Sequence, residues 1–126
     1  MQLETADRHY ESIDDYTIAE AVNAVAELKT DFAILTLEDG SFMQTAGGTS
    51  GMVLEYRVNS TGEHFTASGE TLSAEDVIAA FESFASGDGI YKQVADWQPL
   101  EETTAKGCGS AVLILAAIPT LAYLFS

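Results

Sequence analysis

Residues 52–67 constrain the fold of this chain most strongly, because two alternating patterns within them agree on one strand register. Between residues 52 and 58 the side chains alternate, with Met52, Leu54, Tyr56 and Val58 on one face and Val53, Glu55 and Arg57 on the other. Residues 59–62 favour a turn, and residues 63–67 form the returning strand. If Val58 pairs with Glu63, Tyr56 lies opposite Phe65, and apolar side chains of both strands share one face. The segment therefore predicts an antiparallel hairpin in which Leu54 lies opposite Ala67.

The same register gathers polar side chains on the other face of this hairpin. It places Arg57 opposite His64 and Glu55 opposite Thr66. An arginine beside a histidine can bind an anionic group or a polar side chain of a partner. A solvated sheet face with ordinary cross-strand pairs gives the same pattern, and that alternative stays open. We take these four residues as candidates for partner binding.

Two helices and a first hairpin are predicted around this segment. Thr17 and Glu20 fit a capping box, and apolar residues recur at helical spacing to Leu28, which predicts a helix over residues 17–29. Residues 31–38 and 41–45 are predicted strands joined by a two-residue Asp-Gly turn, with Leu37 opposite Phe42 and Leu35 opposite Gln44. A second helix is expected from Ser73 to a glycine stop at residue 87. After it, residues 90–97 are expected to fold back on the body, anchored by Trp97.

The expected fold class is α+β, with a four-stranded antiparallel sheet (two hairpins) flanked by an N-terminal and a C-terminal helix. Residues 1–15 are expected to be a polar leader and residues 16–99 the globular domain. Residues 100–106 form a polar linker, and residues 107–126 form an apolar tail.

The tail is the sharpest change of composition in the chain. Residues 111–125 carry no charge and would span about 22 Å as a helix, which is short of a bilayer core unless residues 107–110 and 126 are included. We predict a membrane anchor over residues 107–126, with apolar contacts from Ala111, Leu113, Leu115, Ile118, Leu121 and Leu124. A tail that docks on the body or mediates oligomerisation is the alternative. Lys106 favours a cytoplasmic body attached to the inner face of the membrane. Cys108 is a candidate for lipidation, or is simply an unmodified small residue.

The charge balance limits the classes of partner. The chain has 20 Asp and Glu residues and five Lys and Arg residues, which gives a net charge of −15. This balance disfavours nucleic acid, whose phosphates need Lys and Arg, and it would attract a basic protein partner. Simple solubility would explain the same charge.

Motifs for bond-making chemistry are not evident in the sequence. His9 and His64 lie far apart and the chain has one cysteine, so we expect no metal and no cofactor. The glycines at 47, 48 and 51 lack the lysine of a phosphate-binding loop. Adjacent carboxylates are expected at helix starts or in solvent, and we expect no catalysis by them.

A resemblance to a known group can be followed along the body. The stretch Leu-Glu-Asp-Gly-Ser-Phe-Met-Gln-Thr-Ala-Gly-Gly is followed by Val-Leu-Glu-Tyr-Arg, His-Phe, Glu-Asp-Val-Ile-Ala-Ala-Phe and a final Trp. Over residues 32–97 this order resembles small bacterial proteins of the immunity-protein type. The resemblance implies a compact α+β domain that binds a toxin without catalysis, and its matching positions are Gln44, Glu55, Tyr56 and Arg57. Gln44 therefore joins the candidate partner-binding residues.

Three hypotheses of function follow. The first is a non-enzymatic acidic binding module, neutralising a toxin and tethered to a membrane by its tail. The second is a small-ligand-binding enzyme that uses the face of Arg57 and His64. The third is a structural subunit of an oligomeric or membrane assembly, with the tail as its contact.

Overall fold

A computed structural model describes residues 1–48, 51–69 and 72–100 of the chain, in which one sheet and two α-helices form. The elements in chain order are β1 (Gln2–Thr5), β2 (Arg8–Tyr10), α1 (Asp15–Ala26), β3 (Phe32–Thr36), β4 (Phe42–Gly48), β5 (Gly51–Val58), β6 (Glu63–Gly69), α2 (Ala74–Ser86), a 3₁₀ helix η1 (Ile90–Gln93) and β7 (Gln98–Pro99). The strands pair in the order β2-β1-β3-β4-β5-β6-β7, and every pairing is antiparallel.

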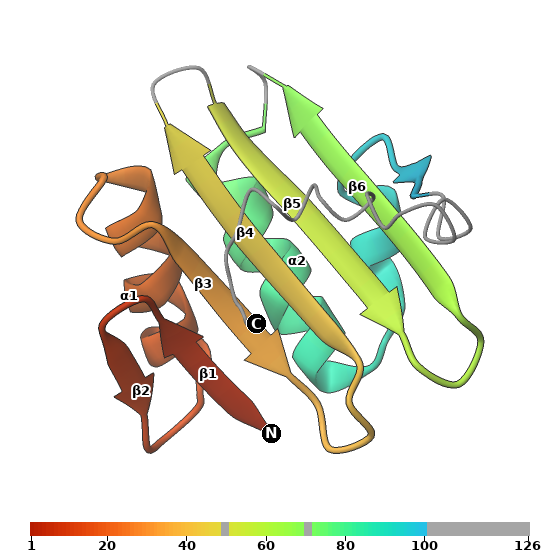
Figure 1. Ribbon diagram of the computed structural model, residues 1–126, viewed down its shortest axis with the longest axis horizontal. Helices are drawn as coiled ribbons and strands as arrows, with labels where there is room; N and C mark the ends of the chain where they lie inside the picture. The colour runs from red at the N-terminus through yellow and green to blue at the C-terminus, as the bar shows by residue number, and fades with distance from the viewer. Residues whose placement is uncertain (49–50, 70–71, 101–126) are drawn as a thin grey trace, which may run out of the picture.

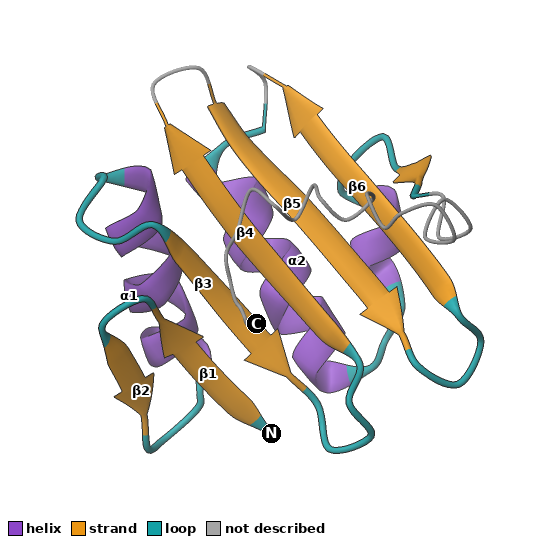
Figure 2. Ribbon diagram, in the orientation of Figure 1, coloured by secondary structure: helices purple, strands orange, loops and turns teal. Residues whose placement is uncertain are grey.

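The molecule has two layers, with both helices on one side of the sheet. In Figure 1 the helices lie behind the strands, and Figure 2 shows the same division by secondary structure. The core between the layers takes alternate residues of the central strands, such as Leu35, Met43 and Leu54, which have no exposed surface. Val22 of α1 and Phe81 of α2 close it from the other side. The opposite face of the sheet is covered by no described helix.

The predicted four-stranded sheet is wrong, because the sheet has seven strands. Three extra strands come from segments whose apolar content is small. Residues 1–15, expected as a polar leader, contribute β1 and β2, and β1 pairs with β3. Leu3 and Tyr10 are buried on the helix side of the sheet, while the charges between them hide this alternation in the sequence. The α+β class itself holds.

The two predicted hairpins had different outcomes. The register of β5 and β6 is confirmed, with Tyr56 opposite Phe65 and Arg57 opposite His64. The register of β3 and β4 is wrong by one residue, because Leu35 lies opposite Met43 rather than opposite Gln44.

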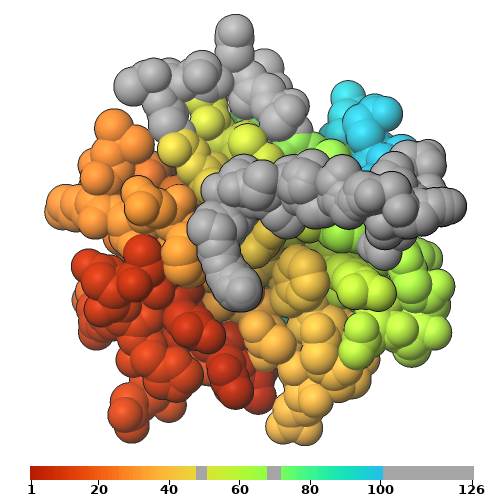
Figure 3. Space-filling view, in the orientation of Figure 1, coloured from red at the N-terminus to blue at the C-terminus, as the bar shows by residue number. Residues whose placement is uncertain are grey.

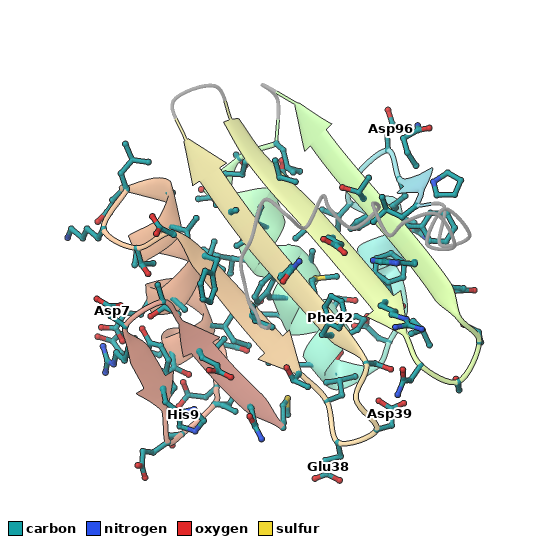
Figure 4. All side chains as sticks on the ribbon, in the orientation of Figure 1. Asp7, His9, Glu38, Asp39, Phe42 and Asp96 are labelled. Atoms are coloured by element: carbon teal, nitrogen blue, oxygen red, sulfur yellow. The ribbon has the colours of Figure 1, made fainter. Side chains whose placement is uncertain are left out.

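The turn between β3 and β4 explains this shift. The backbone N–H of Leu37 donates to the carbonyl oxygen of Ser41 at 2.7 Å, so three residues close the turn instead of two. Gly40 has a φ of +92°, a value open to glycine, and the Asp39 carboxylate accepts a hydrogen bond from the backbone N–H of Ser41. Figure 4 labels Asp39 at the tip of this turn.

Capping residues fix the helix ends. The predicted helix 17–29 is α1 at Asp15–Ala26, because Asp14 rather than Thr17 caps it and the two side chains share the capping box. Leu28 lies past its end with a φ of 63° and is exposed, so it does not continue the apolar stripe. The second helix is confirmed, with Ser73 as its N-cap and Gly87 in the left-handed conformation after its last turn.

An aromatic cluster joins α2, β5 and the segment before β7. The ring of Tyr56 lies 4.7 Å from that of Trp97 and 4.9 Å from that of Tyr91. The indole N–H of Trp97 donates to the carbonyl oxygen of Tyr91 at 3.2 Å. The expected anchoring of residues 90–97 by Trp97 is thus confirmed, and burial of the cluster raises the pKa of Tyr56 to about 12.

The burial of Leu3 predicts that β1 contributes to stability. Leu3→Ala should lower the free energy of unfolding by about 2–5 kcal/mol, because it leaves a cavity under α1. Gln2→Ala, on the exposed face of the same strand, should change it by less than about 0.5 kcal/mol. Urea unfolding of both variants measures the difference, and equal values would show that β1 is not part of the cooperative fold.

The raised pKa of Tyr56 predicts a loss of stability at high pH. A tyrosine with a higher pKa in the folded state stabilises the fold below pH 10, and this contribution declines as pH rises from 10 towards 12. Tyr56→Phe should therefore flatten the decline seen by urea unfolding in that range, with a remainder from Tyr91, whose pKa burial also raises. Tyr16→Phe, at a side chain 75% exposed, is the control. An unchanged slope in Tyr56→Phe would contradict the assignment.

Candidate functional site

The face of the sheet away from the helices holds the predicted site residues. One cross-strand row runs across the whole sheet: His9, Glu4, Ile34, Gln44, Glu55, Thr66 and Gln98. Gln44, Glu55 and Thr66 are therefore direct neighbours at the middle of the row. Figure 3 shows this side of the molecule, formed by strands from the red N-terminal end to the green β6.

A second row lies beside the first and contains the two basic candidates. Phe42 of β4, Arg57 of β5 and His64 of β6 are successive partners in it. The rings of Phe42 and His64 lie edge to face, with centroids 6.3 Å apart. Figure 4 labels Phe42 at the start of β4, where this row crosses the sheet. The structure thus brings all five predicted partner-binding residues together on two adjacent rows.

Glu55 is the centre of a hydrogen-bond network on this face. Its side chain is 8% exposed, yet both carboxylate oxygens have partners. Gln44 Nε2 donates to Oε1 at 2.8 Å, and His64 Nε2 lies 2.5 Å from Oε2. A buried carboxylate needs such partners, because burial without hydrogen bonds is costly. The network holds Gln44 and His64 in fixed positions on either side of Glu55.

Arg57 differs from its neighbours, because its buried Nε has no hydrogen-bond partner. Glu55 lies two residues away on the same strand and face, but both of its oxygens are engaged by other side chains. A buried N–H group without an acceptor is rare in folded proteins. Arg57 is therefore the residue of the site whose bonding capacity the described part of the chain does not satisfy.

Thr66 contributes to the sheet rather than to chemistry. Its hydroxyl donates to the carbonyl oxygen of Leu54 at 3.2 Å, and the hydroxyl of Thr45 makes the same kind of bond to Val53 at 2.8 Å. A nucleophilic hydroxyl would instead donate its proton to a base such as the His64 ring. Among residues 1–48, 51–69 and 72–100, no three His, Cys, Asp or Glu side chains gather in a group that could hold a metal ion.

A second polar region, which the sequence did not predict, lies between β2 and α1. A groove of about 550 Å³ is lined there by residues including Asp7, Arg8, Tyr10, Glu20 and Lys29. Arg8 lies 4.3 Å above the Tyr10 ring and 3.4 Å from a carboxylate oxygen of Glu20, so its charge is already paired. Arg8 and Tyr10 are two residues apart and so lie on one face of a strand, which could have predicted their contact. The prediction of a polar leader over residues 1–15 excluded a strand there.

Comparisons with protein families, with curated proteins and with solved structures find no match to this chain. The predicted lipidation site at Cys108 and the predicted membrane contacts of residues 111–124 lie outside the described residues. In the part of the chain that the structure describes, neither helix has the length and apolar character needed to cross a membrane.

The Gln44–Glu55 hydrogen bond can be measured with a double-mutant cycle. Gln44→Ala and Glu55→Ala should show a coupling free energy of about 1–3 kcal/mol, because each single change leaves a buried polar group without its partner. Gln44→Ala with Gln98→Ala is the matched control, since these strands lie roughly 14 Å apart and their effects should add. Additive effects in both cycles would show that the bond does not stabilise the fold.

Proposed function

We propose that this protein is a non-enzymatic binding module whose sheet face, on the side away from α1 and α2, receives a protein partner. The observation that carries the proposal is Arg57, a cation with an unsatisfied donor beside the satisfied pair Glu55 and His64. Fixed polar groups around one unsatisfied group are typical of a recognition surface, because a partner can supply the missing bond.

The charge of the chain supports a partner that is basic overall. A net charge of −15 raises the rate of encounter with a positive surface and repels polyanions such as nucleic acid. Exposed carboxylates border the face, among them Glu38 and Asp39 at the β3–β4 turn, which Figure 4 labels. The surrounding charge would bring the partner close, and the face would orient it.

Neutralisation of a basic toxin in the cytoplasm is the narrower form of the proposal. It rests on the resemblance to immunity-type proteins over residues 32–97 and on the acidic charge. Tethering to the inner face of a membrane through residues 107–126 belongs to the same proposal.

An enzyme that uses this face is the second candidate, because Glu55 could orient His64 as a base. The hydroxyl of Thr66, a candidate nucleophile on the same face, donates to the backbone carbonyl of Leu54. Binding therefore accounts for more of the face than catalysis does.

Partner capture tests the proposal with two arginine variants. Arg57→Ala should reduce capture of a basic protein from the source cell about tenfold or more, without lowering the melting temperature. Arg8→Ala is the matched control, because Arg8 is the only other arginine and lies in the separate groove. Capture by wild type should weaken as salt rises from 50 to 300 mM, roughly as expected for charge-steered association.

Two results would count against the proposal. Equal capture by wild type and Arg57→Ala would remove the sheet face from the interface. Loss of turnover of a small substrate on His64→Ala, with no protein partner captured, would favour the enzyme.

A further inference from the structure

We propose that Arg57 is a receptor for a carboxylate group, and that the partner of the sheet face presents this group. The inference rests on the proposed function and names the chemistry that the face recognises. Three observations support it: the ion pairs of the chain, the hydrogen-bond network around Glu55 and the buried Nε of Arg57.

The pattern of ion pairs sets Arg57 apart. Among the residues that the structure describes, the other Lys and Arg side chains each have a carboxylate within 4 Å: Arg8 with Glu20, Lys29 with Glu27 and Lys92 with Glu63. Arg57 has no such carboxylate among these residues. In a chain with 20 acidic and five basic residues, an arginine without a carboxylate partner needs a specific cause.

The network around Glu55 supplies this cause. Glu55 is the nearest carboxylate to Arg57 along β5, but Gln44 holds one oxygen and His64 lies against the other. The bonds therefore keep Glu55 from turning towards the guanidinium. Arg57 is therefore left without a carboxylate partner, whereas the other described Lys and Arg side chains each have one.

The geometry of arginine selects the ligand. The Nε–H and one Nη–H form a planar pair of donors that matches the two oxygens of a carboxylate. In the proposed complex the guanidinium turns so that this edge meets the incoming group, and the orphaned Nε–H gains an acceptor. Phe42 and His64 flank Arg57 in the row, and their ring centroids lie 6.3 Å apart.

A single carboxylate is compatible with the acidic charge of the chain, whereas a polyphosphate is not. Repulsion by exposed carboxylates is screened beyond about 8 Å at physiological salt, so one anionic group can reach Arg57 locally. A partner that is basic overall carries that group to the face. The one matching pair of opposite charges would then fix the orientation of the partner.

Glu101 and Glu102 of the same chain are a competing source of carboxylate. The backbone N–H of Leu100 donates to the carbonyl oxygen of His64 at 2.8 Å, so the described chain ends beside the Arg57 row. Both glutamates lie outside the described residues, and the experiment separates them from an external ligand.

The chain offers a direct spectroscopic test, because Arg8 and Arg57 are its only arginines. The two Nε–Hε signals of the ¹⁵N-labelled full chain are recorded while sodium acetate replaces sodium chloride at constant ionic strength. We expect a saturable shift of the Arg57 signal with a midpoint in the roughly millimolar range, as suits one small ligand. The Arg8 signal should stay within a tenth of that shift, and acetamide, which lacks the charge, should move neither. Arg57→Lys assigns the signal.

Two further probes identify the source of the carboxylate in a partner. N-acetylaspartate with its α-carboxyl amidated presents a side-chain carboxylate, and N-acetylglycine presents a C-terminal one. The probe that saturates Arg57 at the lower concentration names the group that the partner supplies. Either preference supports the proposal.

The proposal is overturned if acetate moves neither signal, or moves both equally. It is also overturned if acetate acts only after Glu101→Gln and Glu102→Gln, because the chain would then fill its own site. Loss of partner capture in Arg57→Ala without an acetate response would refute the carboxylate while sparing the proposed function. An acetate response at Arg57, together with unchanged partner capture by Arg57→Ala, would support the carboxylate site and refute the proposed function.

Discussion

Strand β5 lies between β4 and β6, and its pleat sends successive side chains to opposite faces of the sheet. Leu54 and Tyr56 consequently enter the core beneath the helices, while Glu55 and Arg57 emerge on the face that no described helix covers. This alternation links the stability of the domain to the composition of its candidate site. A shift of β5 by one residue would place the Glu55 carboxylate in the apolar core and expose Leu54.

The sequence predicted those parts of the fold whose signals are local. Two alternations determined the β5–β6 register, and Ser73 and Gly87 marked the ends of α2. It missed β1 and β2 because strands of four and three residues offer too few positions for a pattern, and their stability comes from pairing with β3. The β3–β4 register failed because a two-residue and a three-residue turn share the same Asp-Gly signal. Gly40 has a positive φ in either turn, whereas Asp39 would need one only in the two-residue turn and does not have one here.

The part of the candidate site that lies on the β5–β6 hairpin could be predicted, because the register of that hairpin could be predicted. Arg57 opposite His64, and Glu55 opposite Thr66, follow from a single hairpin. The bond between Gln44 and Glu55 does not, because it depends on the pairing of β4 with β5, which joins the two predicted hairpins. The burial of Glu55 and the unsatisfied Nε of Arg57 cannot be predicted from strand alternation alone.

Arg57 departs from the rule that buried donors in a fold have acceptors, and this departure points to a function. A buried donor without an acceptor costs about 1–3 kcal/mol, and a hydrophobic or smaller side chain at the same sheet position would avoid that cost. Arg8 shows that the fold can satisfy an arginine, since it contacts both Glu20 and the Tyr10 ring. Violations of such local rules concentrate at functional sites, where another molecule completes the missing interaction. The proposed partner, attracted by charge and oriented by one carboxylate, would account for both the unsatisfied donor and the acidic surroundings.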